Sequence, residues 1–221
     1  MNKIKLICFD ICGTLVNGNS WRILTEGIGC SYPEHRNIFL RCQKGEITFT
    51  EGERMMTRIF RNSGDAREKL INDIFNNIKV INDGKDLISY LKRKGYLIYL
   101  ISGSLDIYVE SVAKKVGADG FYANSSLEFD DKGIIKKIIY RENEGKVKLE
   151  QLKDLIKKLG ITMDQVVFIG DSDNDVEVFE ATKHGIAING SINGLCKELN
   201  KVAWREFDSA MNNLIDEKLN D

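Results

Sequence analysis

Two acidic clusters in this chain follow short apolar runs, and both contain residue types suited to phosphoryl chemistry. The first cluster, Phe9-Asp10-Ile11-Cys12-Gly13-Thr14-Leu15, comes after residues 4–8. The second, Gly170-Asp171-Ser172-Asp173-Asn174-Asp175, comes after residues 166–169. Short apolar runs of this kind are typical of buried strands. Each cluster is therefore predicted to lie where a buried strand gives way to a turn.

Asp10 is the candidate nucleophile of the first cluster. A carboxylate can accept a phosphoryl group and so divide one difficult displacement into two easier ones. Gly13 permits a sharp backbone turn, and Thr14 offers a hydroxyl and an amide to a phosphate oxygen. The alternative is that Asp10 is simply an acidic residue that ends a surface strand.

Asp171 and Asp175, with Asn174 between them, are the candidate metal ligands of the second cluster. Mg²⁺ prefers oxygen ligands from one or two carboxylates, completed by water and substrate phosphate. A strand end and the first turn of the following helix can direct both side chains to one point. The alternative is an acidic helix N-terminus that the helix dipole stabilises.

Ser102, Gly103 and Lys148 are the candidate phosphate-binding residues between the two clusters. Ser102-Gly103-Ser104 is predicted to end the strand at residues 96–101 and to open a helix, whose N-terminus can hold a phosphate oxygen. Lys148 lies near the start of a helical pattern and can neutralise a transferred phosphoryl group. The alternatives are a plain N-cap for the serines and a solvated surface side chain for the lysine.

The elements that must position these residues alternate along the chain. Strands are predicted at residues 5–9, 96–101, 166–169 and 186–188, and helices at 86–94, 106–116 and 146–159. A glycine follows each of these helical patterns and supplies a left-handed cap. This alternation predicts a doubly wound α/β core with a parallel sheet, in which ligands bind at the carboxyl ends of the strands.

Two segments depart from this alternation. Residues 19–78 contain no strand signal and are predicted to form a helical insertion, which would cover the strand ends as a lid. Residues 127–140 are predicted to form a hairpin with its turn at 130–133. We therefore expect a core of residues 1–16 and 80–221 and a helical cap of residues 17–79.

The motifs resemble, in type and order, those of the haloacid dehalogenase-like (HAD) hydrolase superfamily, and of its phosphoserine phosphatase-like subgroup. The resemblance implies a Rossmann-like core with a cap inserted after the first motif. It implies that Asp10 attacks phosphorus and that Mg²⁺ is held by Asp10, the backbone carbonyl of Cys12 and Asp171, with support from Asp175. The residues implied in phosphate binding are Thr14, Ser102, Gly103, Lys148 and Asn174.

Cys12 departs from the pattern of the phosphatases that the chain resembles. They have a second Asp at this position, which protonates the leaving alcohol and then activates water. A thiol is a poor substitute, and general acid–base catalysis contributes about 10²- to 10⁴-fold in rate. We therefore expect slow turnover of alkyl phosphates and less loss with aryl or acyl phosphates. Dehalogenases of the superfamily lack the acids retained at residues 171–175, which favours phosphorus chemistry.

The insertion also departs from phosphoserine phosphatases. Asn19 and Met56 stand where that subgroup has the Glu and Arg that bind the serine moiety, so phosphoserine is not the expected substrate. Asn19, Phe49 and Met56 are the candidate specificity residues of the cap. Apolar residues such as Phe49 and Met56 could equally belong to its core.

Three functions remain open at this stage. The first is a Mg²⁺-dependent phosphatase that hydrolyses a small phosphorylated metabolite through an aspartyl-phosphate. The second is a catalytically weakened relative that binds a phosphorylated ligand or partner. The third is a phosphotransferase or a phosphonatase, for which Lys44 would be the nominal Schiff-base lysine.

The balance of charged residues argues against two classes of binding partner. The 32 Lys and Arg residues nearly balance the 33 Asp and Glu residues, for a net charge of −1, so neither nucleic acid nor an anionic membrane is an expected partner. The first residues do not form a signal peptide, and no apolar run reaches the roughly 20 residues of a membrane span. We therefore expect a cytoplasmic protein. Five cysteines without paired spacing and two isolated histidines argue against disulfides and zinc.

Overall fold

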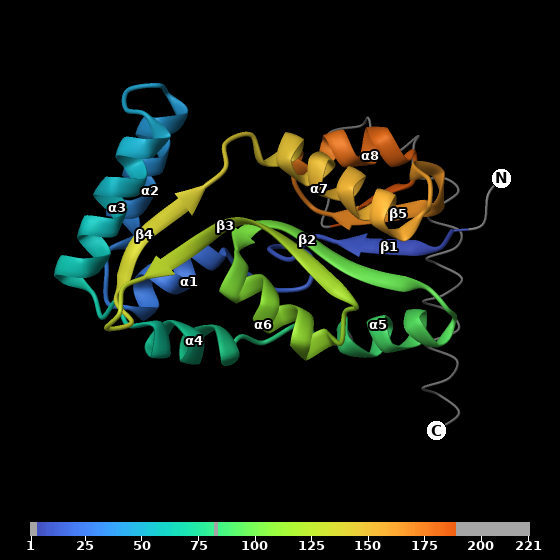
Figure 1. The fold of residues 1–221 in the computed structure, drawn as a ribbon, viewed down its shortest axis with the longest axis horizontal. Helices are drawn as coiled ribbons and strands as arrows, with labels where there is room; N and C mark the ends of the chain where they lie inside the picture. The colour runs from blue at the N-terminus through green and yellow to red at the C-terminus, as the bar shows by residue number, and fades with distance from the viewer. Residues whose placement is uncertain (1–3, 82–83, 189–221) are drawn as a thin grey trace.

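The computed structural model describes residues 4–81 and 84–188. Its centre is a six-stranded sheet with the order β4-β3-β2-β1-β5-β6 (Figure 1). All neighbouring strands are parallel except β3 and β4, which form an antiparallel hairpin. The strands are β1 (Leu6–Phe9), β2 (Leu97–Leu105), β3 (Gly120–Phe129), β4 (Ile135–Tyr140), β5 (Val166–Gly170) and β6 (Gly185–Ala187).

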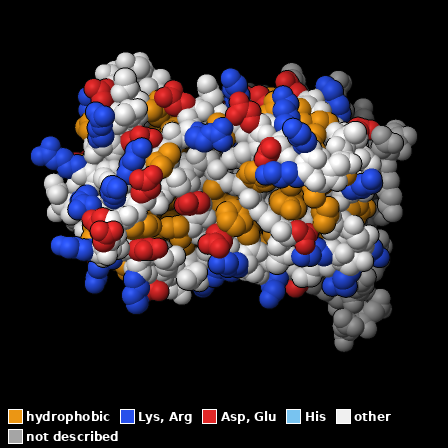
Figure 2. Space-filling view, in the orientation of Figure 1, with side chains coloured by type: hydrophobic (Ala, Val, Ile, Leu, Met, Phe, Trp, Pro, Cys, Tyr) orange, Lys and Arg blue, Asp and Glu red, His pale blue; other side chains and the backbone are white. Residues whose placement is uncertain are grey.

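Helices cover both faces of this sheet. In Figure 1, α5 (Gly84–Arg93) and α6 (Asp106–Val116) lie below it, and α7 (Glu144–Leu159) and α8 (Val176–Thr182) lie above it. Within the described ranges, no helix has the length and apolar character that a membrane crossing requires. Figure 2 shows acidic and basic side chains interspersed on this side of the molecule, as the balanced composition leads one to expect.

Strand β1 illustrates why the buried strands are apolar at every position. Ile7 and Phe9 belong to the hydrophobic cluster that contains residues of α5 and α6, whereas Leu6 and Cys8 belong to the cluster that contains residues of α7 and α8. Successive side chains of a strand point to opposite faces, so a sheet covered on both sides requires apolar residues throughout. The prediction of a doubly wound α/β core is confirmed.

Strand β2 is longer than predicted. It continues to Leu105, so Ser102-Gly103-Ser104 lies inside the strand and not at the start of a helix, which begins only at Asp106. The pairing with β3 shifts register between Ser102 and Leu105. Such an irregularity re-aims the side chains around it and depends on the partner strand, which the sequence of β2 alone does not reveal.

The insertion is helical, as predicted. It contains α1 (Ser20–Gly27), α2 (Tyr32–Gln43), α3 (Phe49–Ser63) and α4 (Glu68–Asn76), which lie with the β3–β4 hairpin at the left end of Figure 1. One hydrophobic cluster runs from these helices into the core; for example, Phe75 of α4 contacts Tyr108 of α6 with ring centroids 5.3 Å apart. The division into core and cap stays a prediction, and residues 189–221 lie outside the described part of the chain.

Helix α3 covers β4, the edge strand of the sheet. Side chains one turn apart on α3 bond to backbone groups of β4 that would otherwise be unpaired. The spacing matches for Glu53 and Thr57, because four helix residues advance about 6 Å and two strand residues about 6.6 Å. This arrangement protects a strand edge from pairing with another chain. The pairs are Glu53 with the Tyr140 N–H (2.7 Å), Thr57 with the Ile138 N–H (3.3 Å) and Arg61 with the Ile135 C=O (2.6 Å).

His35 of α2 is buried in the helical insertion. Its ring lies 5.4 Å from that of Trp21 and 6.0 Å from that of Phe60, measured between centroids. Thr25 uses its hydroxyl proton on the Trp21 carbonyl (2.6 Å), so the His35 Nδ1–H must donate to the Thr25 oxygen (2.7 Å). Burial lowers the pKa of His35 from 6.5 to about 4.

We predict that His35 makes the fold sensitive to mild acid. Between pH 6.5 and pH 4 the unfolded chain takes up a proton at this site while the folded protein excludes it. The free energy of unfolding therefore decreases as the pH is lowered through this range. The loss amounts to about 2 kcal/mol at pH 5. Urea unfolding at pH 7 and pH 5 measures it, and His35→Phe should remove most of this difference. Equal losses in the two proteins would contradict the assignment.

Candidate active site

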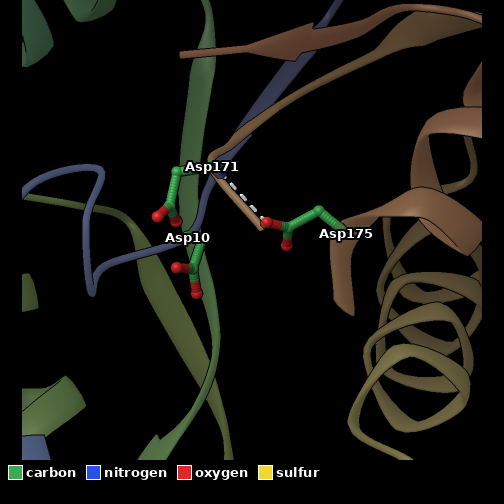
Figure 3. Close-up of side chains that lie close together, drawn as sticks. All are labelled: Asp10, Asp171 and Asp175. Atoms are coloured by element: carbon green, nitrogen blue, oxygen red, sulfur yellow. Dashed lines mark hydrogen bonds between the residues drawn. The ribbon is translucent and has the colours of Figure 1, made fainter. Parts of the chain in front are cut away.

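Three carboxylates meet at the carboxyl ends of two neighbouring strands. Asp10 directly follows β1, Asp171 directly follows β5, and Asp175 reaches toward them from the start of α8 (Figure 3). Strands β1 and β5 are parallel and paired, so their carboxyl ends lie side by side. One oxygen from each carboxylate lies within 4.8 Å of the others. The structure thus brings together three predicted site residues from distant parts of the chain.

Lys148 lies at the centre of this cluster and is fully buried. Its Nζ donates to Asp10 Oδ1 at 3.0 Å, to Asp175 Oδ1 at 2.6 Å and to Asn174 Oδ1 at 2.7 Å. An ammonium has three protons, so these contacts use all of them. Lys148 therefore connects the end of β1, the first turns of α7 and the turn before α8.

The charges of the cluster leave an excess of negative charge. Burial disfavours the ammonium of Lys148, but the carboxylates of Asp10 and Asp175 outweigh this effect and raise the pKa of Lys148. One cation thus faces three carboxylates. Burial, followed by the nearby Asp10, raises the pKa of Asp171. A divalent cation among these oxygens would offset that repulsion, so the donor set suits Mg²⁺.

Asp175 differs from the other two carboxylates in its contacts. Its Oδ2 accepts from the backbone N–H groups of Asp171 (3.1 Å) and Ser172 (3.2 Å), while its Oδ1 accepts from Lys148. A side chain at Gly170 would collide with it, because an added Cβ would lie 2.3 Å from Asp175 Oδ2. Asp175 therefore holds the loop that carries Asp171, and its oxygens are less available to a metal.

The loop after Asp10 packs directly against Asp171. Gly13 has a φ of +83°, and a Cβ at this position would lie 2.0 Å from Asp171 Oδ2. Thr14 donates its hydroxyl to Asp171 Oδ1 (3.4 Å) and its amide to the Ile11 carbonyl (3.1 Å). The predicted contact of Thr14 with phosphate would require one of these donors to be released.

Cys12 directs its thiol toward polar groups in the protein. Its Sγ lies 3.2 Å from Ser104 Oγ and 3.6 Å from the Tyr108 hydroxyl, and Ser104 also accepts from Ser20 (2.9 Å). Burial, with a contribution from Asp10, raises the pKa of the thiol. The thiol therefore stays protonated at neutral pH and is a weak proton donor. Ser20, Ser104 and Tyr108 belong to three different elements, and no sequence pattern indicates that they meet here.

Gly103 and Asn174 meet around Glu144, which no sequence signal had indicated. The Glu144 carboxylate accepts from Asn174 Nδ2 at 2.7 Å and from the Tyr140 hydroxyl at 3.0 Å. A Cβ at Gly103 would lie 2.6 Å from Glu144 Oε2. In the sequence Glu144 is only an acidic residue near a predicted helix start, a common position for carboxylates. The predicted phosphate-binding residue Ser102 is buried beside Gly103 inside β2.

A sequence model of the haloacid dehalogenase-like hydrolases matches residues 4–181 of this chain. The chain belongs to this family. The match covers far more than half of the sequence and includes every motif described above. The predicted membership of the HAD superfamily is confirmed, and the protein is a hydrolase by family.

Several similar proteins are phosphoserine phosphatases, as the predicted subgroup leads one to expect. The Methanocaldococcus jannaschii phosphoserine phosphatase is 28% identical over 198 residues, which cover 89% of this chain and 90% of that protein. The Archaeoglobus fulgidus phosphoserine phosphatase is 27% identical over 84% of this chain but only 52% of its own length. A solved phosphoserine phosphatase with a phospho-aspartyl intermediate analogue is 24% identical, covers 90% of this chain and 92% of its own, and shares the fold with a TM-score of 0.66.

The three candidate specificity residues of this HAD hydrolase have different surroundings. Asn19 is the N-cap of α1 and accepts from the Arg22 N–H at 3.1 Å. Met56 is buried in the hydrophobic cluster. Phe49 stacks on Tyr140, with ring centroids 5.3 Å apart and planes at 16°. Tyr140 bonds to Glu144, so Phe49 is connected to the carboxylate cluster through Tyr140, Glu144 and Asn174.

We predict that Lys148→Met lowers the free energy of unfolding by about 3–5 kcal/mol, because it leaves buried carboxylates without their cation. Lys146→Met, on the exposed surface of the same helix, is the matched control and should change stability by less than about 0.5 kcal/mol. Urea unfolding in the presence of a metal chelator measures both. Equal midpoints for the two variants would mean that Lys148 does not hold these segments together.

Proposed function

We propose that this protein is a Mg²⁺-dependent phosphatase that hydrolyses a small phosphorylated metabolite through an aspartyl-phosphate on Asp10. The observation that carries the proposal is the convergence of Asp10, Asp171 and Lys148 at the carboxyl ends of β1 and β5. The family and the phosphoserine phosphatase relatives support the same class of reaction.

The two carboxylate oxygens of Asp10 have different surroundings, which leave one of them available to attack phosphorus. Oδ1 is held by Lys148, while Oδ2 has no hydrogen-bond partner within the described residues. In the first step Oδ2 forms a bond to phosphorus as the bond from phosphorus to the leaving oxygen breaks. In the second step water attacks the same phosphorus, the bond to Asp10 breaks, and inorganic phosphate leaves. The Asp10 carboxylate is then restored.

Asp10, Asp171 and the backbone carbonyl of Cys12 would hold the metal, and Asp175 would fix the loop that carries Asp171. When bound, Mg²⁺ supplies positive charge that stabilises the phosphoryl oxygens. Lys148 adds a fixed positive charge beside Asp10, and the side chains of Ser102 and Asn174 with the Gly103 amide would complete the proposed phosphate site. The contribution of Lys148 requires no reorganisation, since it is already held among the carboxylates.

The leaving group sets the rate in this proposal. Cys12 occupies the position of a general acid, but its thiol lies against Ser104 and Tyr108 and has a raised pKa. Alkyl phosphates, whose leaving oxygens need a proton, are therefore slow substrates, and aryl or acyl phosphates are faster. Phosphoserine is not proposed as the substrate, because Asn19 serves as an N-cap and Met56 is buried.

The poor acid at Cys12 also favours a second candidate function. A member of the family that keeps its metal and phosphate ligands but lacks an efficient acid could serve as a sensor, which binds a phosphorylated ligand without useful turnover. The two candidates differ in one measurable respect, namely whether the wild-type protein hydrolyses an activated phosphate ester at all.

We predict that the wild-type protein hydrolyses p-nitrophenyl phosphate with Mg²⁺, and that Asp10→Asn reduces the rate to background because the nucleophile is lost. Cys12→Asp should raise the rate with an alkyl phosphate by about 10²- to 10⁴-fold, because it supplies the missing acid, and the rate with the aryl ester by less. Phosphate release measures all of these rates, and a chelator should abolish them.

Cys42→Ser is the control. Cys42 is a second buried cysteine, located in α2, with its thiol at the Thr48 carbonyl, so its substitution should leave both rates unchanged. Full activity of Asp10→Asn would contradict the aspartyl-phosphate mechanism. A silent wild type with an active Cys12→Asp would replace the phosphatase by the sensor.

A further inference from the structure

Glu144 lies among the groups proposed to bind phosphate, although it is itself an anion. Its carboxylate accepts from Asn174 Nδ2 (2.7 Å), and Asn174 Oδ1 accepts in turn from Lys148 (2.7 Å). The position of a Cβ at Gly103 would be 2.6 Å from Glu144 Oε2. Glu144 is therefore separated from the central lysine by a single side chain.

The charge of Glu144 is not balanced by a neighbouring cation. Its hydrogen bonds come from two neutral donors, the Asn174 amide and the Tyr140 hydroxyl, and it has no ion pair within residues 4–81 and 84–188. Glu150 on the same helix, by contrast, pairs with Arg141 at 2.9 Å. A carboxylate oxygen can accept two hydrogen bonds, so each oxygen of Glu144 has one position left.

Aromatic rings stand beside this carboxylate. Tyr140, which bonds to Glu144, stacks on Phe49 at 5.3 Å and lies nearly perpendicular to Phe39 at 6.2 Å, measured between ring centroids. All three rings, like Glu144, are only partly buried. The carboxylate bonds to the hydroxyl of Tyr140, so its negative charge is the group that attracts an ammonium, and a ring face within about 6 Å of that ammonium would add a cation–π attraction.

A phosphate ester without a positive charge would be repelled by Glu144 as it enters the phosphate site. An ester that carries an ammonium group near its phosphate would instead satisfy both halves of the site, with the phosphate toward Lys148 and the ammonium toward Glu144. The separation of these two side chains by Asn174 alone favours a short link between the two charges of the ligand.

We propose that Glu144 and Tyr140, flanked by Phe49 and Phe39, form a subsite for a substrate ammonium group beside the phosphate site. The inference rests on the proposed function and narrows it to phosphate monoesters of short amino alcohols. Glu144 is then the residue that determines specificity, and Tyr140 is a positioning residue that fixes its carboxylate.

Two phosphate esters of equal length, only one of which carries an ammonium group, measure the contribution of that positive charge to binding. We compare 2-aminoethyl phosphate, which carries an ammonium at neutral pH, with 2-hydroxyethyl phosphate, which does not. Calorimetric dissociation constants with Mg²⁺ should favour the ammonium probe roughly 10- to 100-fold in the wild type, the factor that a hydrogen bond to a charged group contributes. Glu144→Gln should bring the ratio close to one, and Tyr140→Phe should reduce it.

Glu150→Gln is the matched control, since it removes an exposed carboxylate from the same helix and should keep the wild-type ratio. Thermal unfolding verifies that each variant is folded, and Tyr140→Phe serves as the test if Glu144→Gln is not. A wild-type ratio near one, or an unchanged ratio in the folded Glu144→Gln, overturns the inference. Binding needs no turnover, so loss of the proposed phosphatase activity and loss of the ammonium preference are separate results.

Discussion

The buried ammonium of Lys148 is the interaction on which the rest of the site depends. It contacts Asp10 at the end of β1, Asn174 in the turn between β5 and α8, and Asp175 at the start of α8. None of these groups could be buried alone without a large desolvation cost. The ammonium of Lys148 thus allows the carboxylates of Asp10 and Asp175 to be buried. Because it neutralises only one of the three negative charges in the cluster, the remaining charge can attract a divalent cation.

Much of this arrangement could be predicted from the sequence, because buried parallel strands must be apolar and must end at the same edge of the sheet. Asp10 and Asp171 follow two such strands, so their proximity is a consequence of topology. The end of β2 was predicted wrongly. Its continuation to Leu105 depends on irregular pairing with β3, which begins at Gly120, before the predicted hairpin at residues 127–140. Only the neighbouring strand supplies that information.

Within the site, the sequence indicated the residues with strong chemistry but not their partners. Asp10, Asp171 and Asp175 were named because they lie at or just after the ends of buried strands, and Lys148 was named from the family resemblance. The structure brings the four together, while their roles stay predictions. The contacts of Cys12 with Ser104 and Tyr108 join positions about ninety residues apart. Glu144 resembled an ordinary acidic helix start, and its surroundings become visible only when Gly103 and Asn174 are folded against it.

The bonds between α3 and β4 have a mechanical consequence. Glu53, Thr57 and Arg61 bond to backbone groups of the edge strand, and Arg61 also pairs with Asp130 at 3.2 Å, so α3 is tied to the hairpin at several points along its length. The strand ends at Tyr140, whose hydroxyl holds Glu144. A displacement of α3 would therefore be passed through Phe49 and β4 to Tyr140, and so to the bond that holds Glu144 at the start of α7.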